Sequence, residues 1–247
     1  MTVIDDPIIV FDEPVIVFDL DDTLYLERDF VRSGYAAVGD WMERTLGVAG
    51  FAERAWAVFE RGERAHVFDS VLADIDFGDR PDLVATLVAL YRDHLPAIAL
   101  APDAATWLQR HRHRTRLALL TDGAAATQMN KLRALGLTDG GIDPLVCTGH
   151  WGRAFWKPHP RGFAHIAAHH GLPGAGFVYV ADNPAKDFIA PRALGWRTVQ
   201  IVRPGAIHAT PAGQVPGVGA DIVITSLDDL DDCLAAAALW SVRDGIA

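Results

Sequence analysis

Residues 15–24 read Val-Ile-Val-Phe-Asp-Leu-Asp-Asp-Thr-Leu, and this is the most informative stretch of the chain. Four apolar residues run directly into carboxylates, a pattern typical of a strand buried on both faces of a parallel sheet. The strand ends at Asp19 and Asp21, and two like charges so close together need a cation or a proton between them. The stretch therefore predicts a divalent-metal site, a shared-proton acid–base site, or both.

The composition is that of an ordinary globular protein. The chain has 247 residues, of which 50% are hydrophobic and 22% charged, enough for one large domain or a domain with an insertion. The net charge of −10 disfavours a nucleic-acid-binding surface, and it requires any phosphate site to be made locally positive. We find no signal peptide, no apolar run near the roughly 18–20 residues of a membrane span, and only two isolated cysteines. These features predict a cytoplasmic protein that binds neither membrane nor nucleic acid, and they leave the oligomeric state open.

Strands and helices alternate after residue 96. This alternation predicts crossover units and therefore an α/β fold with a mostly parallel sheet. Residues 8–12 resemble residues 15–19, so they form either a preceding strand or only an apolar arm. The expected strands span 116–120, 144–148, 177–180, 197–202 and 221–224, and the expected helices span 103–111, 124–135, 161–170 and 185–194.

The region between residues 25 and 95 has a different pattern. Its apolar residues recur at helical spacing, with breaks between helices at 47–50 and 77–81. Pro81 suits the first turn of the helix that follows it. We therefore expect an all-helical insertion at 25–95, and a core domain made of residues 1–24 and 96–247.

Polar residues stand where the predicted strands end, which is where open parallel sheets bind their ligands. Asp19 and Asp21 follow the first strand, Thr121 follows the second, and Asp182 follows a later one. Lys157 lies just ahead of a helix N-terminus and could reach the same pocket. The carboxylates could bind a metal, whereas the hydroxyl and the lysine could bind an anion.

These positions carry a resemblance to a known family. Residues 18–24, 120–123, 157–158 and 180–187 match, in order, the four motifs of the haloacid dehalogenase-like (HAD) superfamily. The helical insertion falls where that superfamily carries its C1 cap domain. The resemblance thus implies a Rossmann-like three-layer core with an inserted all-helical C1 cap.

The resemblance also implies roles in phosphoryl transfer. Asp19 would be the nucleophile that forms an aspartyl-phosphate, and Asp21 would be the general acid and then the base. Thr121 and the backbone amides that follow it at Asp122 and Gly123 would hold the phosphoryl oxygens. Lys157 would neutralise charge on both Asp19 and the phosphate.

The same resemblance implies a Mg²⁺ cofactor. Asp19, Asp182 and the main-chain carbonyl of Asp21 would bind the ion, and Asp187 would orient this set of ligands. Oxygen-only ligation suits magnesium, which retains several of its waters. Ala181 departs from the family pattern, because a glycine usually precedes the fourth-motif aspartate, and its methyl group could narrow the backbone approach.

Asp21 distinguishes two branches of the superfamily. The dehalogenases that resemble this chain have the first aspartate but lack the second, because a halide leaving group needs no proton whereas an alkoxide does. The presence of Asp21 favours a phosphatase that acts on a small phosphorylated metabolite, with a sugar phosphate preferred and a nucleoside monophosphate second.

Other activities of the same fold stay open. A phosphomutase is one, and a catalytically weak binding or scaffold protein is another. A phosphonatase would need a cap lysine, and residues 25–95 contain none. Glu27 and Arg28 connect the first strand to the cap, where they could contact the substrate's leaving group or could be simple linker charges.

Overall fold

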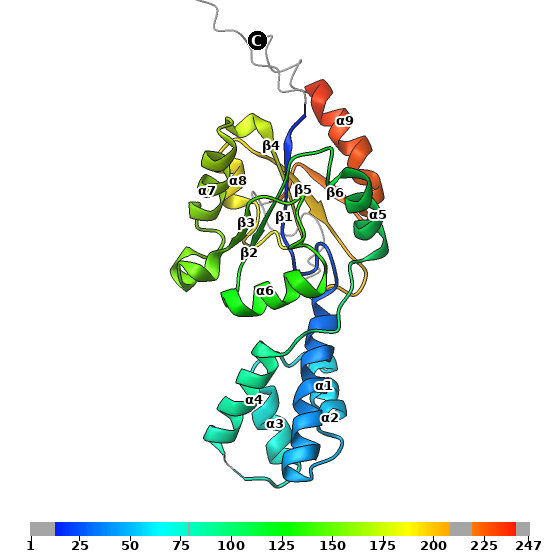
Figure 1. Cartoon of the computed structure of the whole chain (residues 1–247), viewed down its shortest axis with the longest axis vertical. Helices are drawn as coiled ribbons and strands as arrows, with labels where there is room; N and C mark the ends of the chain where they lie inside the picture. The colour runs from blue at the N-terminus through cyan, green and yellow to red at the C-terminus, as the bar shows by residue number, and fades with distance from the viewer. Residues whose placement is uncertain (1–12, 79, 208–218, 241–247) are drawn as a thin grey trace, which may run out of the picture.

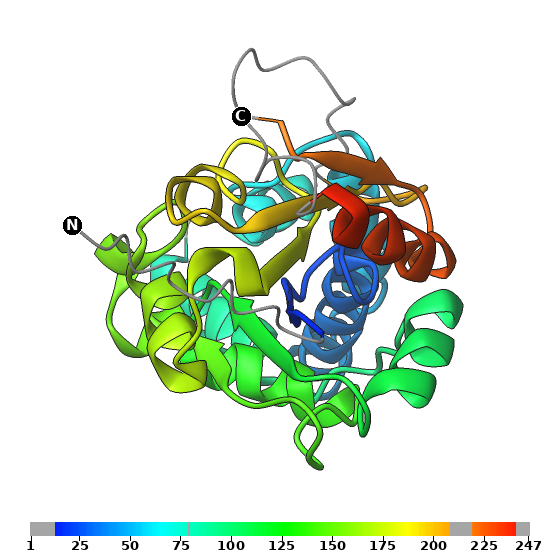
Figure 2. The same ribbon diagram turned by 90° about the horizontal axis from the view of Figure 1, so that it is seen from above.

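The protein is built on a six-stranded sheet in which every neighbouring pair of strands is parallel. The computed structural model describes residues 13–78, 80–207 and 219–240, and the segment 8–12 lies outside these ranges. The strand order is β3-β2-β1-β4-β5-β6, which confirms the expected α/β fold (Figures 1 and 2). The strands are β1 Val15–Phe18, β2 Leu117–Thr121, β3 Leu145–Cys147, β4 Phe177–Ala181, β5 Arg197–Ile201 and β6 Ile222–Ile224.

Helices cover both faces of this sheet and give three layers. Because side chains alternate along a strand, Ile16 and Phe18 of β1 pack into one apolar cluster, whereas Val15 and Val17 pack into another. The first cluster is covered by α5 Pro102–His111, α6 Ala125–Ala134 and α9 Leu230–Trp240, and the second by α7 Arg161–His170 and α8 Ile189–Ala193. Four short 3₁₀ helices complete the core: η1 Thr148–His150, η2 Arg153–Phe155, η3 Gly174–Gly176 and η4 Leu227–Asp229.

A separate helical unit stands at the carboxyl end of the sheet (Figure 1). It consists of α1 Glu27–Leu46, α2 Phe51–Glu60, α3 Val67–Asp74 and α4 Pro81–Asp93. These helices bury their own apolar cluster, which includes Val38, Phe51 and Leu87, each at most 1% exposed. Burial of each such side chain contributes roughly 1.5–3 kcal/mol, so the unit has a core of its own. Pro81 is the first residue of α4, as expected.

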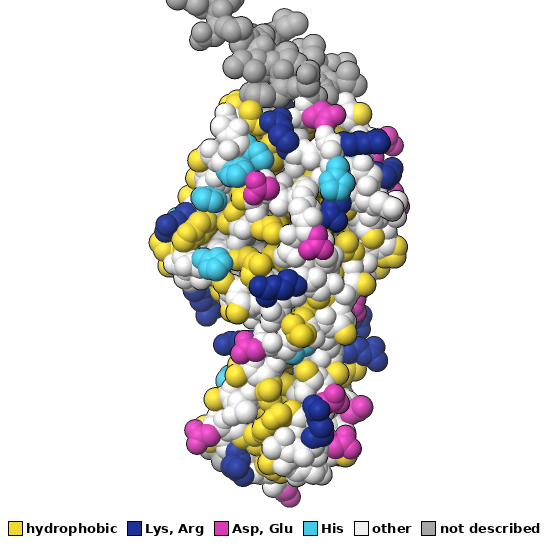
Figure 3. Space-filling model, viewed as in Figure 1, with side chains coloured by type: hydrophobic (Ala, Val, Ile, Leu, Met, Phe, Trp, Pro, Cys, Tyr) yellow, Lys and Arg dark blue, Asp and Glu magenta, His cyan; other side chains and the backbone are white. Residues whose placement is uncertain are grey.

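The space-filling view shows the molecule narrowing where the helical unit joins the core (Figure 3). On the face drawn there, Lys and Arg side chains are scattered among acidic and apolar ones. Within the described ranges, no helix is both long enough and apolar enough to span a membrane.

The start of α1 is fixed to the core by buried polar groups. The Asp22 carboxylate accepts hydrogen bonds from the backbone N–H of Glu27 at 2.8 Å and of Ile207 at 2.7 Å. Arg203 donates from Nε to the carbonyl of Thr23 at 2.7 Å. Asp22 therefore caps α1 by satisfying one of its otherwise unpaired N–H groups, and it ties that helix to the loop after β5.

One sequence-based expectation about the secondary structure is wrong. The helix expected over residues 185–194 begins only at Ile189. The residues before it form a turn in which Asn183 Oδ1 accepts from the N–H of Ala185 at 3.0 Å. Asp187 Oδ2 in turn accepts from the N–H of Asn183 at 3.1 Å. These local bonds compete with helix formation and direct Asp187 back toward the end of β4.

Candidate active site

A large cavity opens at the carboxyl ends of the strands, beside the helical unit. Its volume is about 750 Å³, and its lining includes the strand-end residues Asp19, Thr121 and Asp182. Phe30 from α1 and Tyr91 from α4 also line it, so the core and the helical unit share the cavity. This location agrees with the rule that open parallel sheets bind ligands at the carboxyl ends of their strands.

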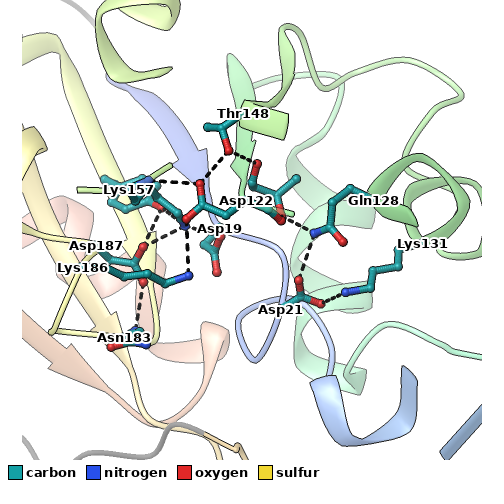
Figure 4. Close-up of polar contacts among 12 residues, drawn as sticks. Asp19, Asp21, Asp122, Gln128, Lys131, Thr148, Lys157, Asn183, Lys186 and Asp187 are labelled. Carbon is teal, nitrogen blue, oxygen red and sulfur yellow. Dashed lines mark hydrogen bonds and ion pairs between the residues drawn. The ribbon is translucent and has the colours of Figure 1, made fainter. Parts of the chain in front are cut away.

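Asp19 lies at the centre of a buried ionic cluster (Figure 4). Lys157 Nζ is 2.5 Å from Oδ1 of Asp19 and 2.8 Å from Oδ1 of Asp187, and it also lies 3.0 Å from the hydroxyl of Tyr179. Burial raises the pKa of Asp19 to about 6, although Lys157 opposes the shift. Burial alone would lower the pKa of Lys157, but Asp187 and Asp19 hold it well above its ordinary value. Lys157 is therefore a buried cation in contact with Asp19.

Three carboxylates of this cluster can share one cation. Asp19, Asp182 and Asp187 each offer an oxygen, and these oxygens lie within 4.8 Å of one another. Burial raises the pKa of Asp182 to about 9, and repulsion from Asp19 and Asp187 adds to the shift. Such crowding is relieved by a bound cation, and three hard oxygen donors suit Mg²⁺. The residues present therefore fit the magnesium site that the sequence predicts, whereas the side chain of Asp21 lies outside this carboxylate cluster.

Thr121 begins the loop expected to hold phosphoryl oxygens. It is the last residue of β2 and is buried, and the loop leads directly into the N-terminus of α6. Gly123 adopts a φ of +117°, which favours glycine. A Cβ on Gly149 would lie 1.9 Å from the carbonyl oxygen of Gly123, so glycine is required where the two loops touch. The loop geometry therefore depends on both glycines.

Asp122 holds together the loops that contain Thr148 and Lys157. Its Oδ1 accepts a 2.7 Å hydrogen bond from the hydroxyl of Thr148 and a 3.1 Å bond from the backbone N–H of Lys157. Lys186 Nζ lies 3.6 Å from the other carboxylate oxygen of Asp122. The side chain of Asp122 therefore fastens these loops at the cavity wall and also faces a second lysine.

Asp21 occupies the opposite side of the cavity from Lys157 (Figure 4). Its Oδ1 lies 2.7 Å from Lys131 Nζ, and its Oδ2 accepts a 3.0 Å hydrogen bond from Nε2 of Gln128. The Tyr25 hydroxyl also donates to Oδ1. Burial would raise the pKa of Asp21, but the charge of Lys131 and these donors hold it below its ordinary value.

The two residues at the start of α1 point to different places. Glu27 lines the cavity, and burial, followed by the charge of Asp21, raises its pKa to about 7. Arg28 is not among the lining residues; it forms a 2.8 Å ion pair with Glu60 and lies over the ring of Trp56. The structure therefore brings Glu27, and not Arg28, to the other predicted site residues.

Several residues of the site carry no role in the sequence-based prediction, among them Gln128, Lys131, Tyr179 and Lys186. Gln128 and Lys131 occupy neighbouring positions on one face of α6, a spacing that in sequence looks like an ordinary surface helix. One compositional signal could have found two of them. The chain contains only three lysines, at 131, 157 and 186, and all three line this cavity.

Ala181 is accommodated away from the cavity. Its side chain is fully buried in the apolar cluster that also contains Phe188 and Trp196, and it is not among the residues that line the cavity. The methyl group that replaces the usual glycine hydrogen is thus packed in the core.

Comparison with known proteins identifies the family. The sequence model of the haloacid dehalogenase-like hydrolase family matches residues 14–195, which is more than half of the chain. The protein therefore belongs to the haloacid dehalogenase-like hydrolase family, and it is a hydrolase by that membership. No curated protein matches its sequence.

Solved structures share the fold. The HAD-hydrolase YfnB of Bacillus subtilis, determined with bound magnesium, has a TM-score of 0.64 at 16% identity and covers 90% of this chain and 98% of its own. A HAD family hydrolase of Deinococcus radiodurans, with bound phosphate and sodium, has a TM-score of 0.64 at 25% identity over 92% and 97%. The L-2-haloacid dehalogenase of Xanthobacter autotrophicus has a TM-score of 0.59 at 19% identity over 90% and 98%.

Proposed function

We propose that the protein is a Mg²⁺-dependent phosphomonoester hydrolase that acts through an aspartyl-phosphate on Asp19. The observation that carries this proposal is the presence of Asp21 in the same cavity as Asp19 and the carboxylate cluster. A leaving alkoxide needs a proton donor and a halide does not, so a second carboxylate at this position is of use to a phosphatase. The Deinococcus radiodurans relative, which was determined with bound phosphate, adds support.

The proposed reaction has two displacements at phosphorus. A carboxylate oxygen of Asp19 attacks the phosphorus atom and the bond to the ester oxygen breaks. Asp21 must enter this step protonated, although Lys131 lowers its pKa, and it gives that proton to the departing alkoxide. Asp21 then takes a proton from a water molecule that attacks the same phosphorus, which breaks the bond to Asp19 and releases phosphate. Two steps of this kind replace one difficult displacement.

The remaining residues provide charge and position. Lys157 compensates negative charge on Asp19 and on the transferred group, and Thr121 with the amides of residues 122 and 123 receives its oxygens. Asp19, Asp182 and the main-chain carbonyl of Asp21 would hold the magnesium ion and Asp187 would orient these ligands, and the ion would neutralise charge on the phosphoryl oxygens. This local positive charge answers the repulsion expected from the net charge of −10.

The proposed substrate is a small phosphorylated metabolite, with a sugar phosphate favoured. A cavity of about 750 Å³ whose lining combines charged and apolar side chains suits such a molecule. The helical unit would serve as a cap that excludes water during transfer. We place the protein in the cytoplasm, which is compatible with cysteines that are both unpaired. A nucleoside monophosphate, a phosphomutase reaction and a binding role are the alternatives to be tested.

Hydrolysis of p-nitrophenyl phosphate with Mg²⁺ and with EDTA tests the proposal. We expect phosphate release that EDTA abolishes and that added Mg²⁺ restores. Chloride release from 2-chloropropionate, measured in parallel, tests the dehalogenase activity found in structural relatives. Dehalogenation without phosphate release would contradict the proposal, and a panel of sugar phosphates and nucleotides would then define the substrate.

A further inference from the structure

In the structure, a single nitrogen atom of Gln128 hydrogen-bonds to both Asp21 and Thr121. Gln128 Nε2 donates to Oδ2 of Asp21 at 3.0 Å and to Oγ1 of Thr121 at 2.5 Å. Thr121 belongs to the phosphoryl cradle, and Asp21 is the proposed proton carrier. The amide of Gln128 therefore sets the separation between the Asp21 carboxylate and Thr121 of the proposed phosphoryl cradle.

Gln128 is itself held in place. It is 2% exposed, and a Cβ built on Gly123 would lie 3.3 Å from its amide carbon, so its side chain packs closely against the loop that starts at Thr121. A buried amide whose donors are used in this way has little freedom to move, and its loss would leave Oδ2 of Asp21 without this donor.

Lys131 holds the other oxygen of Asp21 from the next turn of α6. Its side chain is 5% exposed, its Nζ lies 2.7 Å from Oδ1 of Asp21, and the same atom lies 4.2 Å from the ring centre of Phe30 in α1. Buried lysines are rare unless they are paired. This chain carries nearly all of its positive charge on arginine, so a buried lysine at this position is unusual for the chain. Lysine provides a more compact cation than arginine would.

We infer that Gln128 and Lys131 are positioning residues that hold Asp21 at the distance from Thr121 at which it can protonate the leaving group. The inference rests on the proposed function, because it assigns these residues to a proton transfer in that reaction. Such a role has a specific signature. A misplaced proton donor matters for a poor leaving group and matters little for a good one.

The test compares phenyl phosphate, which has the poorer leaving group, with p-nitrophenyl phosphate. We expect Gln128→Met and Lys131→Met to lower kcat/KM for phenyl phosphate about 10- to 100-fold more than for p-nitrophenyl phosphate, a part of what general acid catalysis provides. Lys131→Arg, which keeps a charged donor, should lose less than Lys131→Met. Arg133→Met removes an exposed cation from the same helix and should change neither substrate.

A double-mutant cycle makes the test specific to Asp21. In an Asp21→Asn background no proton is carried at this position, so Gln128→Met should no longer change the ratio of the two substrates. Equal losses for both substrates, or an undiminished Gln128→Met effect in that background, would overturn the positioning role. If Lys131→Met does not fold, as judged by thermal unfolding, Gln128→Met carries the same test because it removes no charge.

Failure of the inference is distinguishable from failure of the proposed function. A wild-type protein that releases no phosphate from either ester would contradict the function itself. An active wild-type protein whose variants lose activity uniformly would contradict only the role of Gln128 and Lys131.

Discussion

Lys157 Nζ lies 2.5 Å from Oδ1 of Asp19, and both side chains are almost completely buried. The two residues are far apart in sequence and meet because the strand that ends at Asp19 and the loop before α7 converge at one edge of the sheet. A buried ammonium in contact with this oxygen favours the ionised form of Asp19, and in the proposed reaction it would oppose charge build-up on the phosphate.

Removal of this ammonium should affect both activity and stability. Lys157→Met would leave the Asp19 and Asp187 carboxylates buried without their counter-ion, and breaking a buried pair costs about 3–5 kcal/mol. We expect kcat for p-nitrophenyl phosphate to fall by at least about 10²-fold, on the scale of losing one preorganised electrostatic contact. Steady-state kinetics and urea unfolding measure the two effects, and Arg92→Met, which removes a cation from the cavity rim, is the control for charge alone. A Lys157→Met variant with unchanged kcat would contradict this role.

The metal-free protein should lose stability as the pH rises. Asp182 has a folded pKa of about 9 against 3.8 for the unfolded chain, so between these values the folded state holds a proton that the unfolded state has released. The contribution of Asp182 to the free energy of unfolding is complete below about pH 4 and is lost as the pH rises through 9. Asp19, with a folded pKa of about 6, contributes in the same direction, and its contribution is lost as the pH rises through 6. Thermal unfolding in EDTA at several pH values measures the slope.

Mg²⁺ should remove most of that slope. An ion at a concentration 100 times its Kd stabilises the folded state by about 2.7 kcal/mol, which corresponds to a rise in Tm of roughly 5–10 °C at this chain length. The rise should be larger at pH 8.5 than at pH 5.5, because protons compete with the ion for the carboxylates. An Asp182→Asn variant should show little of either effect, and a rise equal to that of the wild type would contradict the assignment of Asp182.

Glu27 and Arg28 form a matched pair of neighbouring charges with different expected effects. Glu27 faces the cavity, so Glu27→Gln should change KM or substrate preference across a panel of phosphate esters. Arg28 pairs with Glu60 on the surface of the helical unit, so Arg28→Ala should leave kinetics within about twofold and cost at most about 1 kcal/mol. If Arg28→Ala instead changes KM and Glu27→Gln does not, the described orientation of α1 is wrong.

A substitution at Tyr179 tests the contacts that hold Lys157 and Asp187 in place. Its hydroxyl lies 3.0 Å from Lys157 Nζ and donates to Asp187 at 3.4 Å. Tyr179→Phe removes only this oxygen, so we expect a loss of about 1–3 kcal/mol in the free energy of unfolding and a smaller loss of kcat than in Lys157→Met. Val178→Ala, at the neighbouring position on β4, is a packing control whose loss should appear in stability alone.

Much of the fold could be predicted because its signals are local. Continuous apolar runs at 117–120 and 177–181 lie in buried strands, and the polar residues that follow them face one cavity because parallel strands share a carboxyl edge. The four motif matches also indicated which strand ends carry the candidate site residues. The turn at residues 184–188 was missed because a pattern of apolar residues does not report that side-chain oxygens will compete for backbone N–H groups there.

The partners of Asp21 could not be predicted from the sequence, for a physical reason. Gln128 and Lys131 follow Asp21 by more than a hundred residues, and polar residues on a helix normally face solvent. Their burial follows from how α6 packs against α4, β3 and η1, which depends on the whole fold. The use of only three lysines in the chain is the one sequence signal that separates Lys131 and Lys186 from the many surface arginines.

Direct detection of the phosphoryl group on Asp19 is the measurement closest to the central proposal. The protein would be mixed with p-nitrophenyl phosphate and Mg²⁺, quenched in acid during turnover, digested, and examined by peptide mass spectrometry. We predict that the peptide containing Asp19 gains one phosphoryl group, and that Asp19→Asn shows neither this gain nor phosphate release. Turnover that persists in Asp19→Asn, or a phosphoryl group found on another residue, would contradict the account.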